Sequence, residues 1–183
     1  MRTVTYGAAC SLDGFIAGSA GEIDWLHFSR DVNDIMRAYW KSVDAILMGR
    51  KTWDQAVRMG GGPMSGKSKI RTYIFSRTLK SLDAKGVELV RGDAGAFVTD
   101  LKSRAGEGIC LMGGGDFARS LFAANVVDEV GMNVHPVLLG AGVPMFVDPS
   151  HRVGLDLITS RTIEGGCVYS MYRVKPAAFA RAS

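Results

Sequence analysis

Short apolar runs alternate with amphipathic helical patterns through residue 124 of this chain, and this alternation constrains its fold more than any other feature. The run at 44–49 predicts a buried strand, and residues 50–59 then place apolar side chains at helical spacing. Further strands are predicted at 72–75, 87–90 and 109–112, with helices at 94–104 and 116–124. Alternating strands and helices predict an α/β fold in which a mostly parallel sheet carries helices on its faces.

The two ends of the chain carry other patterns. Residues 3–9 predict a strand, and 11–17 predict a turn that leads into a long loop rich in Gly, Ser and Ala. An apolar stripe from Val32 to Trp40 predicts a helix, with Ser29 or Asp31 as its N-cap. After residue 125, strand patterns at 127–134, 154–160 and 167–174 follow without a helix, which predicts antiparallel strands. We expect one domain over 1–175 and a frayed tail at 176–183.

Composition excludes several classes of protein. Hydrophobic residues make up 47% and charged residues 22% of the chain, as in globular proteins and unlike disordered ones. The longest nearly apolar stretch, 137–147, is far shorter than the roughly 20 residues of a membrane span. The N-terminus has no apolar block of the kind found in signal peptides. We therefore expect a cytoplasmic protein that contacts no membrane.

The net charge, the cysteines and the histidines indicate which partners and cofactors the protein can have. The net charge of +4 is scattered, so we expect no nucleic-acid partner, while a positive balance suits an anionic small molecule. The three cysteines form no CxxC pair and are expected to be reduced and buried. The three histidines lack the spacing of metal ligands, and no metal site is expected.

One glycine-rich stretch matches the phosphate loop of ATPases. Residues 61–68 have the pattern GxxxxGK[ST], in which backbone amides and the lysine hold phosphates. A phosphate loop follows a buried strand and opens a helix, whereas this stretch follows a helical pattern and precedes a strand. We interpret it as a surface connection and keep an ATP-binding module as the alternative.

Two other glycine-rich stretches have a strand before them and a helix after them. Gly113 to Ala118 matches the relaxed pattern GxGxxG/A, in which close backbone approach and a helix N-terminus suit a pyrophosphate. This motif comes too late in the chain for a plain Rossmann domain, and Asp128 and Glu129 follow it too closely. The stretch from Gly49 to Thr52 is the second, and it opens a helix with two cations.

Cations at a helix N-terminus oppose the macrodipole, so Arg50 and Lys51 call for a compensating anion. Ser76 and Arg77 follow the next predicted strand. Because right-handed crossovers bring the ends of consecutive parallel strands to one sheet edge, these side chains should lie near the first two. We expect Arg50 and Arg77 to clamp one phosphate.

The order of these motifs resembles that of the dihydrofolate reductase superfamily. Within it, the chain is similar to the branch of the C-terminal reductase domain of the bacterial bifunctional riboflavin deaminase-reductase. The resemblance covers about residues 2–175. It rests on Ala8-Ala9, Ser11 to Ala17, Met48 to Trp53, Ile74 to Arg77, Met112 to Phe117, Val127 to Val130 and His135 to Gly142.

The resemblance implies a dihydrofolate reductase-like fold of three layers (αβα) and an NADPH-dependent oxidoreductase. It implies hydride transfer to a C=N bond of a ribosylaminopyrimidine-like substrate, as in the 5-amino-6-(5-phosphoribosylamino)uracil reductases of riboflavin biosynthesis. Met112 stands where the riboflavin enzymes usually have Glu, so a dihydrofolate or pterin reductase is an alternative. A protein that binds the cofactor without turnover is another. The resemblance and the C-terminal sheet edge also imply a homodimer.

The resemblance also implies roles for single residues. Ala9, Ile16 and Ala17 would line the nicotinamide, and the other cofactor residues would hold the phosphates or form the opposite wall. The expected cofactor residues are Ala9, Ile16, Ala17, Gly49, Arg50, Lys51, Thr52, Ser76, Arg77, Gly113, Gly114, Gly115, Asp116 and Phe117.

Asp31 resembles the lone carboxylate that holds the substrate and helps to protonate it. We expect it to be the ionisable group nearest the transferred hydride, with Asn133 hydrogen-bonded to it as the second catalytic residue. The loop before the helix departs from the family pattern, so Asp24 and Asp34 are the alternative candidates for this carboxylate. The other interpretation of Asp31 is a helix cap.

Overall fold

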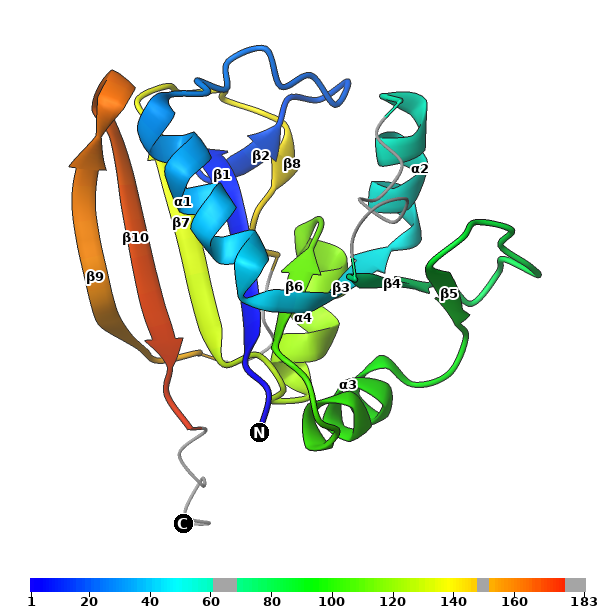
Figure 1. The fold of residues 1–183 in the computed structure, drawn as a ribbon. Coiled ribbons are helices and arrows are strands. Elements are labelled where there is room, and N and C mark those ends of the chain that lie inside the picture. Colours follow the sequence, from blue (N-terminus) through cyan, green and yellow to red (C-terminus); the bar gives the residue numbers. More distant parts are fainter. Residues whose placement is uncertain (61–68, 148–151, 177–183) are drawn as a thin grey trace, which may run out of the picture.

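The computed structural model of the protein describes residues 1–60, 69–147 and 152–176, and Figure 1 shows a large sheet flanked by helices. The strands of this sheet are β1 (Val4–Ser11), β3 (Val43–Gly49), β4 (Arg71–Phe75), β5 (Val87–Val90), β6 (Gly108–Met112), β7 (Glu129–His135), β9 (Leu155–Ile163) and β10 (Cys167–Val174). The helices are α1 (Arg30–Lys41), α2 (Arg50–Arg58), α3 (Ala94–Ser103), α4 (Gly115–Ala123) and the short 3-10 helix η1 (Glu164–Gly166). Two short strands, β2 (Phe15–Ala17) and β8 (Val143–Pro144), pair in a separate sheet.

The strand order across the large sheet is β5-β4-β3-β6-β1-β7-β10-β9. The strands from β5 to β7 in this order pair in parallel, whereas β10 pairs antiparallel with both β7 and β9. Strand β9, orange in Figure 1, forms one edge of the sheet, and β5 forms the other. This arrangement confirms the predicted α/β fold with antiparallel strands at its C-terminal end.

Helices cover both faces of the sheet, and each face has its own apolar core. On one face, Tyr39 and Trp40 of α1 and Trp53 of α2 pack against strand residues that include Ile46 and Ile74. On the other face, apolar side chains of α3 and α4 form a larger core with β1 and β7. Part of each predicted helical stripe packs in these cores, although Met36 of α1 and Val57 of α2 are exposed. The result is the expected three layers of helix, sheet and helix.

Two predictions made from the sequence need correction or refinement. Ser29 is the N-cap of α1, because its side chain accepts a hydrogen bond from the backbone N–H of Val32 at 3.2 Å. Asp31 therefore does not cap the helix and lies in its first turn. The turn predicted at 11–17 is wrong in its second half, where residues 15–17 form β2. This strand pairs with β8, which lies about 130 residues later in the chain. A local sequence pattern cannot predict a pairing over such a separation.

The described residues also include the three cysteines and the helices named above. All three cysteines are buried, as expected. None of the helices in the described ranges has the length and apolarity needed to cross a membrane, and no cluster of three or more metal-ligating side chains occurs in those ranges.

The stretch 61–68 and, except for Pro176, the predicted tail lie outside the described residues. The elements that flank 61–68 are α2 before it and β4 after it, the reverse of the order around a phosphate loop.

Candidate functional site

A cavity of about 1630 Å³ lies at the carboxyl ends of strands β3, β4, β5 and β6. Strands β3 and β6 are neighbours, but the chain leaves them in opposite directions along the sheet. Helix α2 connects β3 to β4 in one direction, and α4 connects β6 to β7 in the other. Such a reversal of direction is the topological switch point at which open α/β sheets bind ligands. The cavity exceeds the roughly 300–1,000 Å³ of a site for one small ligand, so it has room for a dinucleotide or for two ligands.

Two helix N-termini meet in this cavity. The N-cap of α2 is Gly49 and the N-cap of α4 is Gly114, and neither helix has a side chain that bonds its first N–H groups. Those N–H groups have no partner within the helix, so an anion in the cavity can accept from them. Gly113 has a φ of +136°, and a Cβ there would lie 2.6 Å from Oγ1 of Thr52. Only glycine allows the two N-termini to approach this closely.

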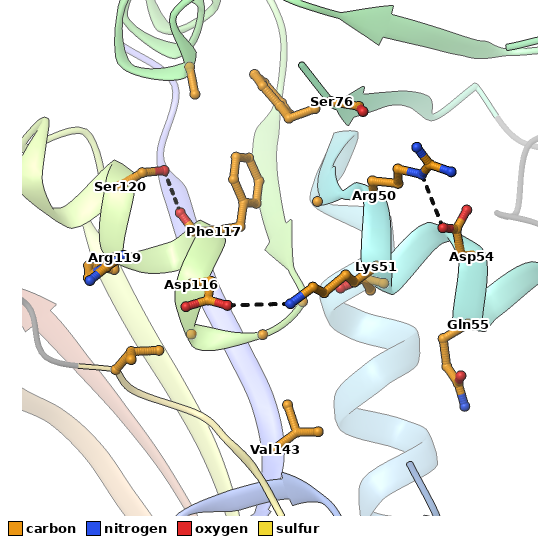
Figure 2. Close-up of a pocket in the computed structure, with 18 of the residues that line it drawn as sticks. Arg50, Lys51, Asp54, Gln55, Ser76, Asp116, Phe117, Arg119, Ser120 and Val143 are labelled. Atoms are coloured by element: carbon orange, nitrogen blue, oxygen red, sulfur yellow. Dashed lines mark hydrogen bonds and ion pairs between the residues drawn. The ribbon is translucent and has the colours of Figure 1, made fainter. Parts of the chain in front are cut away.

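Carboxylates accompany the two cations at the start of α2. Arg50 Nε lies 3.2 Å from Oδ2 of Asp54, and its guanidinium also donates to Oγ1 of Thr78 at 3.2 Å. Figure 2 shows Lys51 and Asp116 pointing toward one another from α2 and α4, with Nζ and Oδ2 3.8 Å apart. The Lys51 side chain is 95% exposed. Exposed pairs of this kind contribute at most about 1 kcal/mol, so both cations remain available to an anionic ligand.

The two-stranded sheet β2–β8 forms one wall of the cavity. Ile16 and Ala17 line it from β2, and Val143 and Pro144 line it from β8. The wall is tightly packed at Gly142, where a Cβ would lie 2.2 Å from the carbonyl oxygen of Ala17. The side chains of this wall are apolar or small, which suits the face of a flat ring.

The structure brings together all but one of the fourteen residues predicted to bind the cofactor. The exception is Ala9, which lies on β1 beside Asn133 of β7 and does not line the cavity. Those that line it are Ile16, Ala17, Gly49, Arg50, Lys51, Thr52, Ser76, Arg77, Gly113, Gly114, Gly115, Asp116 and Phe117. Their convergence follows from the parallel sheet, because the segments after β3, β4 and β6 all leave the same edge. Their roles toward a cofactor stay predictions.

The cavity lining includes further residues that were not predicted from the sequence. Arg91, Gly92 and Asp93 follow β5 and precede α3, and all three line the cavity. The signal that identified Ser76 and Arg77, a polar or cationic pair after a predicted strand, was present at this position too. Arg119 of α4 also lines the cavity, and no local pattern in the sequence distinguishes it.

The predicted catalytic residues lie outside the residues that line the cavity. Asp31 is exposed, and its Oδ2 accepts a hydrogen bond from the backbone N–H of Glu164 at 3.0 Å. The alternative carboxylate of Asp34 lies 3.6 Å from Arg37, and Asp24 is exposed in the loop before α1. The expected hydrogen bond between Asn133 and Asp31 is wrong, because Asp31 accepts from Glu164 and the amide nitrogen of Asn133 lies beside His135.

Asn133 belongs to a compact cluster around a buried imidazole. Its Nδ2 lies 3.2 Å from Nε2 of His135, whose Nδ1 lies 3.4 Å from Sγ of Cys167. Burial and, to a smaller extent, the charge of His27 lower the pKa of His135, so this ring is neutral near pH 7. The ring of Trp25 stands edge-on to His135 with centroids 5.4 Å apart. Asn133 Oδ1 and Trp25 Nε1 are buried without a hydrogen-bond partner.

Comparison with known proteins adds evidence of ancestry. A family model described as the RibD C-terminal domain matches residues 2–169. The uncharacterized protein YyaP of Bacillus subtilis is 31% identical over 180 residues, which cover 93% of this chain and 94% of that protein.

Solved structures show the same architecture. A protein from Shewanella sp. PV-4 that is described as a riboflavin biosynthesis protein has a TM-score of 0.81 and 25% identity, and the match covers 96% of this chain and 100% of that one. Dihydrofolate reductase from Enterococcus faecalis, solved with NADP(H), has a TM-score of 0.65 and 17% identity, with coverage of 95% and 97%. The fold is therefore dihydrofolate reductase-like, as the motif order implied.

Proposed function

The chain belongs to the RibD C-terminal domain family, and from this premise we propose that it is an NADPH-dependent reductase. Its reaction would be hydride transfer to a C=N bond of a small ribosylaminopyrimidine-like substrate. The observation that carries this proposal is the cavity at the switch point, where two helix N-termini with glycine caps meet beside two cations. This donor set fits a pyrophosphate, and the apolar wall of β2 and β8 fits a nicotinamide ring.

The residues of the cavity would divide the cofactor among them. The N–H groups at the start of α2 and α4 would hold the pyrophosphate, and Thr52 lies between them. Arg50 and Arg77 would hold the additional phosphate of the adenosine ribose, and Arg91 lines the same part of the strand edge. The bound nicotinamide would supply the hydride. The protein's own contribution is to fix the ring against the wall and to exclude water from its face.

Binding of the nicotinamide cofactor tests the proposal first. We expect NADPH to quench the fluorescence of Trp53, which is buried in α2, or of Trp25, and NADH to do so more weakly. Turnover would then be screened with the phosphoribosylaminopyrimidine and with dihydrofolate. Oxidation of NADPH with the first substrate supports the proposal, and oxidation with the second alone assigns a pterin reductase. Absence of quenching by either cofactor at millimolar concentration contradicts the enzyme function.

Two other functions give different results in the same assays. A cofactor-binding protein without turnover would bind NADPH but oxidise it with neither substrate. An ATP-binding module built on residues 61–68 would lose magnesium-ATP binding in Lys67→Ala, whereas the reductase would keep its affinity for NADPH in that variant. The order of α2 and β4 around this stretch favours the reductase.

The carboxylate at the start of α1 is the predicted proton donor or substrate anchor. Asp31→Asn retains an oxygen that can accept from the backbone of Glu164, but its side chain cannot titrate. We expect turnover to fall about 100-fold, since general acid catalysis contributes about 10²–10⁴-fold. The measurement is the pH profile of kcat with an accepted substrate. Wild-type turnover across the profile would exclude Asp31, and a loss in Asp24→Asn or Asp34→Asn instead would assign that carboxylate.

We also propose that the protein is a homodimer in which a second copy covers β9. This edge strand is exposed along almost its whole length, and Leu155, Leu157 and Ile158 are 40–58% exposed. Exposed apolar edge strands in stable proteins are usually covered by another chain or element. Light scattering at micromolar concentration should give twice the mass of one chain. Leu157→Asp should yield monomers, and Leu12→Asp, an equally exposed leucine away from β9, should not. A monomeric wild type would exclude this dimer.

A further inference from the structure

Asp13 is a charged residue to which the proposed function gives no role. It lies in the turn between β1 and β2, and its carboxylate accepts three hydrogen bonds. Oδ1 accepts from Oγ of Ser11 at 2.6 Å and from the backbone N–H of Leu139 at 3.2 Å, and Oδ2 accepts from the N–H of Gly140 at 2.7 Å. Leu139 and Gly140 belong to the loop between β7 and β8. One carboxylate therefore joins two segments that are far apart in the sequence.

These two segments carry the wall of the cavity. The turn leads directly into β2, and the loop leads directly into β8. The sheet β2–β8 has three residues in one strand and two in the other, and a two-stranded sheet is marginally stable by itself. Two backbone bonds assist it: Leu12 donates to Val137 and Met145 donates to Gly14, both at 2.8 Å. Among the described side chains of this region, the Asp13 carboxylate is the one that bonds both segments.

The chemistry of the three donors requires a carboxylate. The Ser11 hydroxyl and the backbone bonds to Gly140 and Leu139 lower the pKa of Asp13 from its ordinary value, so it is ionised near neutral pH. Each of its oxygens meets at least one donor. An asparagine would place its NH₂ group against the N–H of Leu139 or of Gly140, since an amide has only one accepting oxygen.

We propose that Asp13 is a positioning residue, whose carboxylate clamps the β1–β2 turn to the β7–β8 loop and thereby holds the β2–β8 wall of the cavity in place. This inference rests on the proposed function for its effect on cofactor binding. The clamp itself is a property of the protein alone.

A loosened wall has a specific kinetic signature. If the wall is ordered in only a fraction of the molecules, the cofactor must select that fraction, and its apparent affinity falls by the same factor. Saturating cofactor restores the ordered wall, so kcat is retained while KM for NADPH rises. A merely structural role would instead reduce the amount of folded enzyme, which lowers the apparent kcat and leaves KM unchanged.

The test compares Asp13→Ala and Asp13→Asn with the wild type and with Asp83→Ala, which removes an exposed carboxylate that does not line the cavity. Amide hydrogen exchange, without any cofactor, reports on the clamp. We expect the N–H groups of Gly140 and Met145 to exchange at least about tenfold faster in both Asp13 variants and at the wild-type rate in the control. With NADPH, we expect KM to rise about tenfold and kcat to stay within about twofold.

The outcomes separate this inference from the proposed function. Unchanged exchange in both Asp13 variants overturns the clamp. Faster exchange with an unchanged KM overturns its role in positioning the wall toward the cofactor. If the wild type fails to bind NADPH while the variants exchange faster, the clamp stands and the proposed function fails.

Discussion

Replacement of Asp128 by alanine is expected to lower the free energy of unfolding by about 3 kcal/mol, because it leaves the ammonium group of Lys102 buried without a counter-charge. Lys102 Nζ donates to both carboxylate oxygens of Asp128, at 2.7 and 2.6 Å, and to the carbonyl oxygen of Val126 at 3.1 Å. The lysine side chain is only 10% exposed. The same carboxylate accepts from the backbone N–H of Val4 at 2.8 Å, so its loss also frees the start of β1. Urea denaturation monitored by tryptophan fluorescence measures the change.

A matched control is present on α3. Asp100 pairs with Arg104 one turn later, but both side chains are more than half exposed. Asp100→Ala should therefore cost no more than about 1 kcal/mol. Equal, small losses in the two variants would show that the Lys102–Asp128 pair is solvated in the folded protein and contributes little.

Replacement of Arg50 by alanine is expected to weaken NADPH binding about 10- to 150-fold and to leave NADH binding nearly unchanged. One charged hydrogen bond to a phosphate contributes about 1.5–3 kcal/mol, and only NADPH carries a phosphate on the adenosine ribose. The guanidinium of Arg50 is half-exposed and held by Asp54 and Thr78. It is therefore oriented toward the strand edge before any ligand binds. Fluorescence titration of both cofactors measures the two affinities.

Arg104 offers the matched control for this change. It forms an i,i+4 pair with Asp100 as Arg50 does with Asp54, but it lies at the end of α3 and does not line the cavity. Arg104→Ala should keep both affinities. Equal weakening of NADPH and NADH in Arg50→Ala would mean that Arg50 binds the pyrophosphate that both cofactors share. An unchanged affinity for NADPH would remove Arg50 from the site.

Much of the fold and the cofactor half of the cavity could be predicted because both depend on local patterns. The stripe of α1 and the apolar run of β3 determine their elements within a few residues of the observed bounds. Motifs placed directly after strands, such as Gly49-Arg50 and Gly113-Gly114, converge at one edge because a parallel sheet brings strand ends together. Arg91 follows β5 and lines the cavity for the same reason, but it was not predicted.

The features that could not be predicted depend on contacts between elements that are separate in the sequence. The wall of the cavity forms only when β2 meets β8, and neither is long enough to show a period of two. The surroundings of Asp31 and Asn133 also depend on other elements. Asp31 contacts the connection between β9 and β10, and Asn133 contacts His135. The apolar stripe predicted that Asp31 lies in the first turn of its helix. It could not predict which group the carboxylate of Asp31 contacts.

The position of β1 inside the large sheet affects how the chain folds. Its two sheet neighbours are β6 and β7, which are encoded about 100 and 120 residues later. At the usual ribosomal rate of about 5–20 residues per second, β1 emerges roughly 6–25 s before β7 is complete. Both of its edges stay unpaired until β6 emerges, and the edge that meets β7 stays unpaired for the whole interval. A topology dominated by such non-local pairing folds slowly and exposes an apolar strand to aggregation. For this protein, production at low temperature or with a chaperone that shields extended segments should favour the native state over aggregates.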